Sequence, residues 1–354
     1  MKDKLLKFIN NKWTILTGLI SLVCVSVIYT VNKIAPFGNN SMLDVDFYHQ
    51  YGPLLNELYD RVKDGGSILY SFNTAGGLPF YRNFLNYLSS PFNIILFLFK
   101  KENIVMAFSI IIGLKAVFAS VSMSYYLKKT FKKDGLLTCL FGVLYAFSGY
   151  FCAYYWNIMW LDGMVFLPLI MLGINKIIDE DNPIFYIVFL AIMLFANYFI
   201  SYMICIFSVI YFVGLFIYRG NFKLKNILKK ILMFSLSSVL AAGLVSFMLI
   251  PLAHSLSSIS ATGDTFPAGT SSFSISNYIF NHFTGVNRTV FASDTLPLPN
   301  VYPGMLTLVL ILLIFMNKKI NLKFKIMSLL ILTIFFLSFN ISSLDFIWHA
   351  FHVP

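Results

Sequence analysis

The chain has 354 residues, of which 58% are hydrophobic and 12% are charged, with a mean hydropathy of +0.77. This composition predicts a polytopic membrane protein, because most of the surface is suited to lipid rather than to water. The net charge of +11 does not indicate nucleic-acid binding, since the 26 Lys and Arg lie between apolar blocks, as membrane orientation requires. The cysteines lie in apolar runs without CxxC spacing, which favours core packing over disulfides or a metal site.

Apolar runs of roughly 17 to 25 residues are long enough to cross the hydrocarbon core of a bilayer. The sequence predicts nine of them, near 13–33, 103–127, 136–154, 161–178, 183–198, 199–218, 231–253, 304–316 and 326–341. We read the first as a retained span, because its apolar run is too long for a signal peptide and no small-residue cleavage site follows. We therefore expect an all-α bundle in a single transmembrane domain over residues 1–354.

Basic residues predict the orientation of the chain. Most Lys and Arg lie on the side that holds the N-terminus, which places that side in the cytoplasm. The opposite, extracytoplasmic side receives two long segments, 34–102 and 254–303, and all five histidines: His49, His254, His282, His349 and His352. Long loops also collect polar residues without any function. A face with every group that titrates near neutral pH is nevertheless where we expect chemistry or ligand binding.

The first of these segments predicts interfacial helices. Its apolar residues recur at three- and four-residue spacing, at Phe47, Tyr51, Leu54, Leu55, Leu58 and Val62. The aromatic stripe predicts that this amphipathic helix lies along the bilayer surface. The second segment, 254–303, is rich in Ser, Thr, Asn and Gly and predicts a partly irregular cap.

Asp44 and Asp46 are the first candidates for catalysis. Their i, i+2 spacing lets both approach one site where the backbone is extended or turning. Either is suited to act as a general base on an incoming hydroxyl, and together they are able to hold a divalent cation. Asp46 also precedes an apolar-periodic run, as a helix N-cap does, and the spacing alone does not decide between these roles.

Three further features are candidates for substrate binding. Lys115 lies in the middle of the second span, where it must face a polar cavity or pair with an acid or phosphate; a buried ion pair that fixes helix register explains it equally well. Arg82 and Arg288 are suited to hold phosphate or to anchor the chain at the lipid surface. The turn YYWNIMWLD, with Trp160, is suited to interfacial anchoring or to stacking of a sugar ring.

No Walker A, GxGxxG, HExxH, GxSxG or CxxC motif occurs, which argues against an ATPase, a dinucleotide enzyme, a zinc protease and an esterase. Several blocks resemble the YfhO family of bacterial membrane proteins, in order through nearly the whole chain: DFYHQYGPLL, YSFNTAGG, YLSSPFNIILFLF, FSGYFCAYYWNIMWLDGMVFLPLIMLG, ANYFISYMICIF and LPNVYPGMLTLVLILLIF. Because family members usually continue through more spans, the chain resembles the N-terminal part of one or a short member.

The resemblance implies a GT-C-type membrane glycosyltransferase, in which the first outer loop supplies an acid and the donor is a sugar on a polyprenyl phosphate. The acid falls on Asp46, with Asp44 as a helper, and substrate-binding positions fall on Tyr48, His49, Gln50, Tyr51, Trp160, Asp162 and His349. Lys115, Arg82 or Arg288 would offset the phosphate charge, and His282 is a further candidate on the outer side. No cofactor is expected.

The implied reaction moves a sugar, with inversion, from an undecaprenyl-phosphate carrier to a hydroxyl of an extracytoplasmic cell-envelope polymer such as teichoic acid. Two alternatives remain at this stage. A transporter or flippase would move a lipid-linked envelope precursor without sugar transfer, which fits a lysine within a span. A non-catalytic scaffold for envelope assembly would fit a chain that lacks part of its acceptor site.

Overall fold

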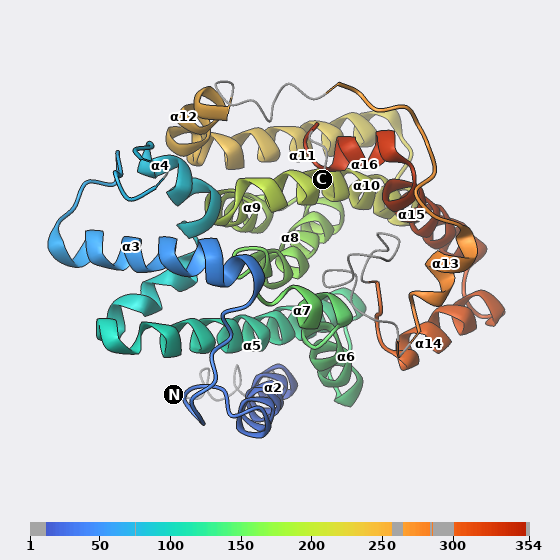
Figure 1. The fold of residues 1–354 in the computed structure, drawn as a ribbon. Coiled ribbons are helices and arrows are strands. Elements are labelled where there is room, and N and C mark those ends of the chain that lie inside the picture. Colours follow the sequence, from blue (N-terminus) through green and yellow to red (C-terminus); the bar gives the residue numbers. More distant parts are fainter. Residues whose placement is uncertain (1–11, 75, 257–264, 284, 286–300, 352–354) are drawn as a thin grey trace, which may run out of the picture.

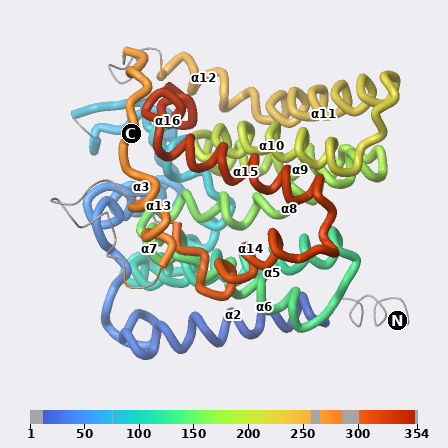
Figure 2. Tube along the Cα trace, turned by 90° about the vertical axis from the view of Figure 1, so that its right-hand side faces the viewer, coloured from blue at the N-terminus to red at the C-terminus, as the bar shows by residue number. Residues whose placement is uncertain are grey.

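The computed structural model describes residues 12–74, 76–256, 265–283, 285 and 301–351. Within these ranges the chain forms helices, and its β-structure is limited to isolated bridges. The long helices lie side by side, and short elements gather around α3 at one end of the bundle (Figures 1 and 2). We call this end, at the left in Figure 2, the loop end. The prediction of an all-α polytopic membrane protein is confirmed.

Seven helical segments of the described chain are long and apolar enough to cross a membrane. They are α2 (Lys12–Val31), α5 (Ile104–Phe131) with the turn before it, α6 (Leu136–Ala146) with α7 (Gly149–Tyr154), α8 (Leu161–Glu180), α10 (Tyr198–Arg219), α11 (Leu224–Leu244) and α15 (Leu322–Asn340).

Three of the predicted runs differ from single long helices. The runs at 183–198 and 304–316 form α9 (Ile184–Ala196) and α14 (Met305–Met316), and the run at 231–253 is divided between α11 and α12 (Ser246–Leu256). Asn197, in an extended conformation, separates α9 from α10, and Val245 separates α11 from α12.

Hydroxyl-bearing side chains and one valine form the protein-facing side of α2. Its buried residues follow helical spacing, at Thr14, Thr17, Ser21, Val25 and Tyr29. Leucine, isoleucine and valine side chains on the other faces are exposed. This arrangement suits a helix in lipid, because small residues allow close packing of helices while apolar side chains are solvated by the bilayer. The α2 helix packs on α5 and α6.

The centre of the bundle is α8, which packs against α5, α9 and α10. Close approach of α9 depends on Gly173, because a Cβ atom there would lie 2.5 Å from the Tyr186 Cα. In contrast to the buried α8, α15 has few buried residues along its length. The fixed position of α8 matters for the site, since its first residues follow the aromatic turn that ends at Trp160.

The loop end is built mainly from the first long segment. After a π-helical turn (Phe47–Tyr51) the chain forms α3 (Gly52–Asp64), α4 (Phe80–Asn83), a second π turn (Phe84–Leu88) and 3-10 turns at Pro91–Leu98 and Lys101–Asn103. Two short helices, α13 (Ile275–Phe280) and α16 (Ser342–Trp348), come from the C-terminal part of the chain. The predicted cap at 254–303 is described in part, at 254–256, 265–283, 285 and 301–303.

The apolar stripe of the amphipathic helix faces protein. Phe47 and Leu55 are fully buried, and the Phe47 ring centroid lies 5.4 Å from that of Phe108 in α5. Of the predicted stripe, only Val62 is exposed. The expected contact of this stripe with the bilayer surface is therefore wrong: the periodicity correctly located a buried face, but the surface that buries it is the helical bundle.

Candidate functional site

A cavity of about 350 Å³ lies at the loop end, among elements from five parts of the chain. Its polar and aromatic lining comprises Tyr51, Arg82, Asn86, Tyr87, Trp160, Asn197, Tyr198 and Phe199. Tyr51 belongs to the first π turn, Arg82 to α4 and Asn86 and Tyr87 to the second π turn, while Trp160 and Tyr198 stand at the starts of α8 and α10. We call this the tyrosine cavity.

Asn197 fixes one wall of the tyrosine cavity. Its side-chain oxygen accepts a hydrogen bond from the Ile200 amide (2.8 Å), which caps α10, and its amide nitrogen donates to the Asn86 carbonyl (2.9 Å). The buried Asn197 side chain therefore caps the start of α10 and holds the second π turn against this end of the helix. Asn86, Tyr87, Asn197 and Tyr198 were not predicted as site residues from the sequence. The helix boundary at Asn197 was predictable, since an asparagine between two apolar runs is a typical N-cap.

Asp46 and Arg82 approach the tyrosine cavity from different elements. Burial, followed by the Asp46 carboxylate, raises the pKa of Tyr51, whose hydroxyl donates to the Asn157 side chain (3.0 Å). Burial also raises the pKa of Tyr87, where Asp46 acts in the same direction and Gln50 and Arg82 act against it. An anionic and a cationic group thus lie within electrostatic range of one tyrosine hydroxyl.

The N-cap interpretation of Asp46 finds no support in the structure. Asp46 precedes the first π turn, but its side chain makes no capping hydrogen bond there. Asp46 is partly exposed, so its carboxylate is accessible while its neighbour Phe47 is buried. The carboxylate instead faces the Tyr51 hydroxyl, which places it beside the tyrosine cavity.

Asp44 is engaged elsewhere. One carboxylate oxygen accepts a hydrogen bond from the Tyr155 hydroxyl and the other from the Val45 amide, both at 3.0 Å. Val45 has a φ of 46°, a left-handed conformation that is unfavourable for a β-branched residue, and such strain concentrates at functional sites. Within the described part of the chain, no group of three or more His, Cys, Asp or Glu is placed to hold a metal ion. The divalent cation at Asp44 and Asp46 stays a prediction, in which Asp44 would contribute oxygen atoms that already accept bonds from Tyr155 and Val45.

Lys115 and Asp162 form an ion pair in the core instead of lining a cavity. The Lys115 Nζ lies 3.0 Å from Asp162 Oδ2 and donates to the Ile158 carbonyl at 2.7 Å, and both side chains are 0% exposed. Ser90 donates to the other Asp162 oxygen (3.0 Å). The expectation that Lys115 and Asp162 contact substrate is wrong for this structure, because each is enclosed by protein partners. Their role is to join α5, α8 and the segment that follows the second π turn.

The remaining predicted residues lie at different distances from the tyrosine cavity. Tyr48 is 61% exposed, and its ring meets that of the exposed His49 edge-on. His349 binds Asp345 through Nδ1, and its ring lies beside Phe199, which lines the cavity. His282 contacts the Tyr278 carbonyl on α13 and does not line the cavity. Arg288 lies outside the described residues.

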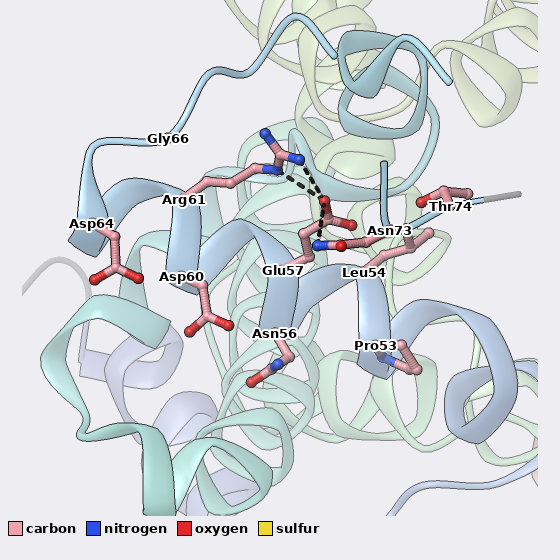
Figure 3. Close-up of a pocket in the computed structure, with 10 residues that line it drawn as sticks. All are labelled: Pro53, Leu54, Asn56, Glu57, Asp60, Arg61, Asp64, Gly66, Asn73 and Thr74. Atoms are coloured by element: carbon pink, nitrogen blue, oxygen red, sulfur yellow. Dashed lines mark hydrogen bonds and ion pairs between the residues drawn. The ribbon is translucent and has the colours of Figure 1, made fainter. Parts of the chain in front are cut away.

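Two other cavities are relevant. One of about 510 Å³ lies along α3 and is lined mainly by polar side chains; we call it the α3 cavity (Figure 3). The other, of about 730 Å³, lies between α2, α5, α8 and α9 and is mostly apolar, with Phe92, Phe118, Phe166 and Phe189 in its lining. We call it the apolar cavity.

The chain matches a known family of membrane proteins. The family described as "Bacterial membrane protein YfhO" matches residues 18–354. The chain belongs to the YfhO family. A YfhO protein of Bacillus subtilis (strain 168), named as uncharacterized, is 28% identical over 138 residues, which is 39% of this chain. The matched part spans only 16% of that relative. No solved structure matches this YfhO chain.

Proposed function

We propose that this YfhO protein is a membrane glycosyltransferase that transfers a sugar from a polyprenyl-phosphate donor to a hydroxyl group of an envelope polymer such as teichoic acid, outside the cytoplasm. The observation that carries the proposal is the convergence of Asp46 and Arg82 on Tyr87 at a cavity that also contains Trp160. This arrangement offers a base, a cation for a phosphate and an aromatic face for a sugar ring. Membership of the YfhO family supports the same class of protein.

The reaction assigns a separate task to each of these groups. Asp46 accepts the proton of the acceptor hydroxyl as its oxygen attacks the anomeric carbon. The bond between that carbon and the phosphate oxygen breaks, its electron pair leaves with the lipid phosphate, and the configuration at the carbon inverts. Arg82 offsets the charge that develops on the phosphate, and Trp160 supports the sugar ring.

Neutral polar side chains supplement the charged groups of this site. Tyr51 and Tyr87 lie with ring centroids 5.3 Å apart, and both hydroxyls are protonated at neutral pH. The Tyr51 hydroxyl donates its proton to Asn157, so the Tyr87 hydroxyl is the one that faces a ligand as a donor. A protonated hydroxyl is able to donate a hydrogen bond to a phosphate or a sugar oxygen. Asn86 adds a side-chain amide of the kind that binds sugar hydroxyls.

The apolar cavity supports a lipid-linked donor. Its lining is almost entirely apolar, and Phe118 and Ile94 at this cavity are exposed on the surface of the bundle. Such a surface suits a hydrocarbon chain, whereas the charged head of the same lipid requires a cationic group such as Arg82.

The flippase alternative loses one of its supports. Lys115 pointed to a polar pathway within the membrane, but Asp162, Ile158 and the Phe92 ring surround it completely. Charged residues within spans commonly mark transport pathways when they face a cavity, and this pair does not.

The decisive experiment uses the full chain, purified and reconstituted, with a synthetic polyprenyl-phosphate sugar and a hydroxyl-bearing polymer. Loss of a general base typically costs on the order of 10²- to 10⁴-fold in rate, so we expect Asp46→Asn to reduce transfer by that factor. Glu102→Gln is the matched control, because Glu102 is an exposed acid that lines none of the cavities described above. Undiminished transfer by Asp46→Asn would remove Asp46 as the base. Movement of the lipid without transfer would instead support a flippase.

A further inference from the structure

The α3 cavity is a second polar concavity, separate from the proposed transfer site. Figure 3 shows Asn56, Asp60 and Asp64 in a row along α3, with Glu57 and Arg61 in the adjacent row. Asn73 and Thr74 reach the cavity from the loop that follows α3. Carboxylates and amides supplied by one helix and one loop are the groups that bind hydroxyl-rich ligands through multiple hydrogen bonds.

Glu57 is a fixed hydrogen-bond acceptor at this cavity. Arg61 donates to its Oε1 through Nε and Nη2 at 2.9 and 2.7 Å, and Ser71 and Asn73 donate to the same oxygen. The Glu57 side chain is only 10% exposed. No described residue donates to its second oxygen, Oε2, within hydrogen-bond distance, and that oxygen is not among the fully enclosed atoms. Because the protein binds Oε1, the Glu57 carboxylate has a fixed position and its Oε2 is able to accept a hydrogen bond from a ligand.

Arg61 holds the loop that follows α3. Its third nitrogen donates to the Ser67 carbonyl, and its guanidinium group lies 4.4 Å from the centre of the Phe80 ring. Each of its three nitrogens thus binds a protein group, and its charge is opposed by the Glu57 carboxylate.

The charge of the α3 cavity selects against phosphate. Its lining contains the carboxylates of Glu57, Asp60 and Asp64 but only one cationic side chain, Arg61. Asp60 also pairs with Lys101 at 2.7 Å, which leaves Asp64 as the uncompensated acid on the row. A phosphate would be repelled by this net negative charge, whereas a hydroxyl group donates readily to a carboxylate.

Exposed aromatic side chains accompany the polar ones. Tyr70 and Phe72 lie on the loop that carries Asn73, and their rings meet edge-on with centroids 5.0 Å apart. Phe72 is 80% exposed. An aromatic ring in water next to carboxylates and amides offers the apolar face on which the C–H groups of a sugar or polyol pack.

The α3 cavity lies about three helical turns from Asp46, the proposed general base. The chain passes from Asp46 through one π turn directly into α3, so Asn56 follows Asp46 by ten residues of nearly continuous helix. At about 1.5 Å per residue, the two side chains are roughly 15 Å apart along the helix direction. An extended chain lying along α3 would span this distance, whereas a single sugar would not.

We propose that the α3 cavity binds uncharged, hydroxyl-rich units of the acceptor chain, several units away from the hydroxyl that reacts near Asp46. Its role as an acceptor subsite rests on the proposed transfer function, but the binding itself requires no transfer. The acceptor is therefore recognised at two places. This preference narrows the envelope polymer of the proposed function to one with uncharged, hydroxyl-bearing segments, and it argues against a teichoic acid with a phosphate in every unit.

A binding experiment on the purified full chain tests this proposal without any donor lipid. The probes are an uncharged gluco-oligosaccharide of six to eight units, as an order-of-magnitude match to the span of α3, and a glycerol-phosphate oligomer of similar length. We expect the oligosaccharide to bind and the phosphate oligomer to bind more weakly. Loss of one or two hydrogen bonds in Asn73→Ala or Asp64→Asn should weaken oligosaccharide binding by about five- to tenfold.

The controls separate this proposal from the transfer function. Glu102→Gln, which removes an acid outside the cavity, should leave oligosaccharide binding unchanged. Absence of oligosaccharide binding, preference for the phosphate oligomer, or equal affinities of the variants and the parent would each overturn the proposal. Oligosaccharide binding that depends on Asn73 and Asp64 in a protein without transfer activity would support the α3 site and reject the transfer function alone.

Discussion

The buried pair of Lys115 and Asp162 gives the sharpest test of the structure, because both side chains are 0% exposed and are joined at 3.0 Å. Replacement of Lys115 by Met would leave the Asp162 carboxylate with Ser90 as its remaining described hydrogen-bond donor. An unpaired buried charge costs about 3–5 kcal/mol, a large share of a typical unfolding free energy of about 5–15 kcal/mol. We expect Lys115→Met and Asp162→Asn each to lower the unfolding free energy by about that amount.

The double variant distinguishes an ion pair from two independent contacts. With both charges removed, no carboxylate or ammonium group remains unpaired, so the combined loss should be smaller than the sum of the single losses by at least about 2 kcal/mol. Denaturant titration of the purified protein in detergent measures all three values. Lys176→Met is the control, since its pair with Glu180 is at the surface and is worth about 0.5 kcal/mol. Additive losses, or single losses below about 1 kcal/mol, would refute the reasoning.

Three other predictions concern the loop end. Tyr155→Phe removes the hydroxyl that binds Asp44 and should destabilise the protein by about 1 kcal/mol in the same titration, with Tyr48→Phe, at an exposed ring, near zero. Trp160→Ala should raise the KM for the sugar donor by about tenfold, whereas Trp160→Phe, which keeps a ring, should raise it less; equal effects would contradict stacking. At His349, burial lowers the pKa, but hydrogen bonds to Asp345 and its charge outweigh burial and raise it overall. Stability from this contact is thus full below the ordinary pKa of about 6.5 and is lost as pH rises through the raised folded-state value. Unfolding at pH 6 and pH 8 should show that loss in the parent and not in His349→Gln.

The membrane class and the spans follow from the sequence, because apolar runs of sufficient length have few alternatives to helices in a bilayer. The breaks within the runs were harder to predict. Asn197 and Val245 end helices through local backbone conformation and capping, and hydropathy averaged over a long window conceals such single positions. The amphipathic period at Phe47–Leu58 identified a buried face, but periodicity does not say whether protein or lipid buries it.

The candidate site was predictable only in part. Tyr51, Arg82 and Trp160 were selected from the sequence, and they line the tyrosine cavity. Asp46 was selected too; it lies beside the Tyr51 hydroxyl and does not line the cavity. Lys115 was correctly identified as unusual, but its partner Asp162 is 47 positions away and the pairing depends on how α5 meets α8. The wall formed by the second π turn depends on a contact between Asn86 and Asn197 across 111 positions, which no local pattern encodes.

The pattern of α2 has a consequence for how the protein is made. Most of its leucine, isoleucine and valine side chains are exposed, and its buried side is narrow and mainly hydroxyl-bearing. The helix is therefore stable in the bilayer before the helices that pack on it have been synthesised. Insertion and docking are then separate events. The Thr17 hydroxyl meets Ser124 only once α5 has entered the membrane, and Gly142 of α6 leaves room for Thr17 at the same junction. This contact of α2 therefore forms only after about a hundred further residues have been synthesised.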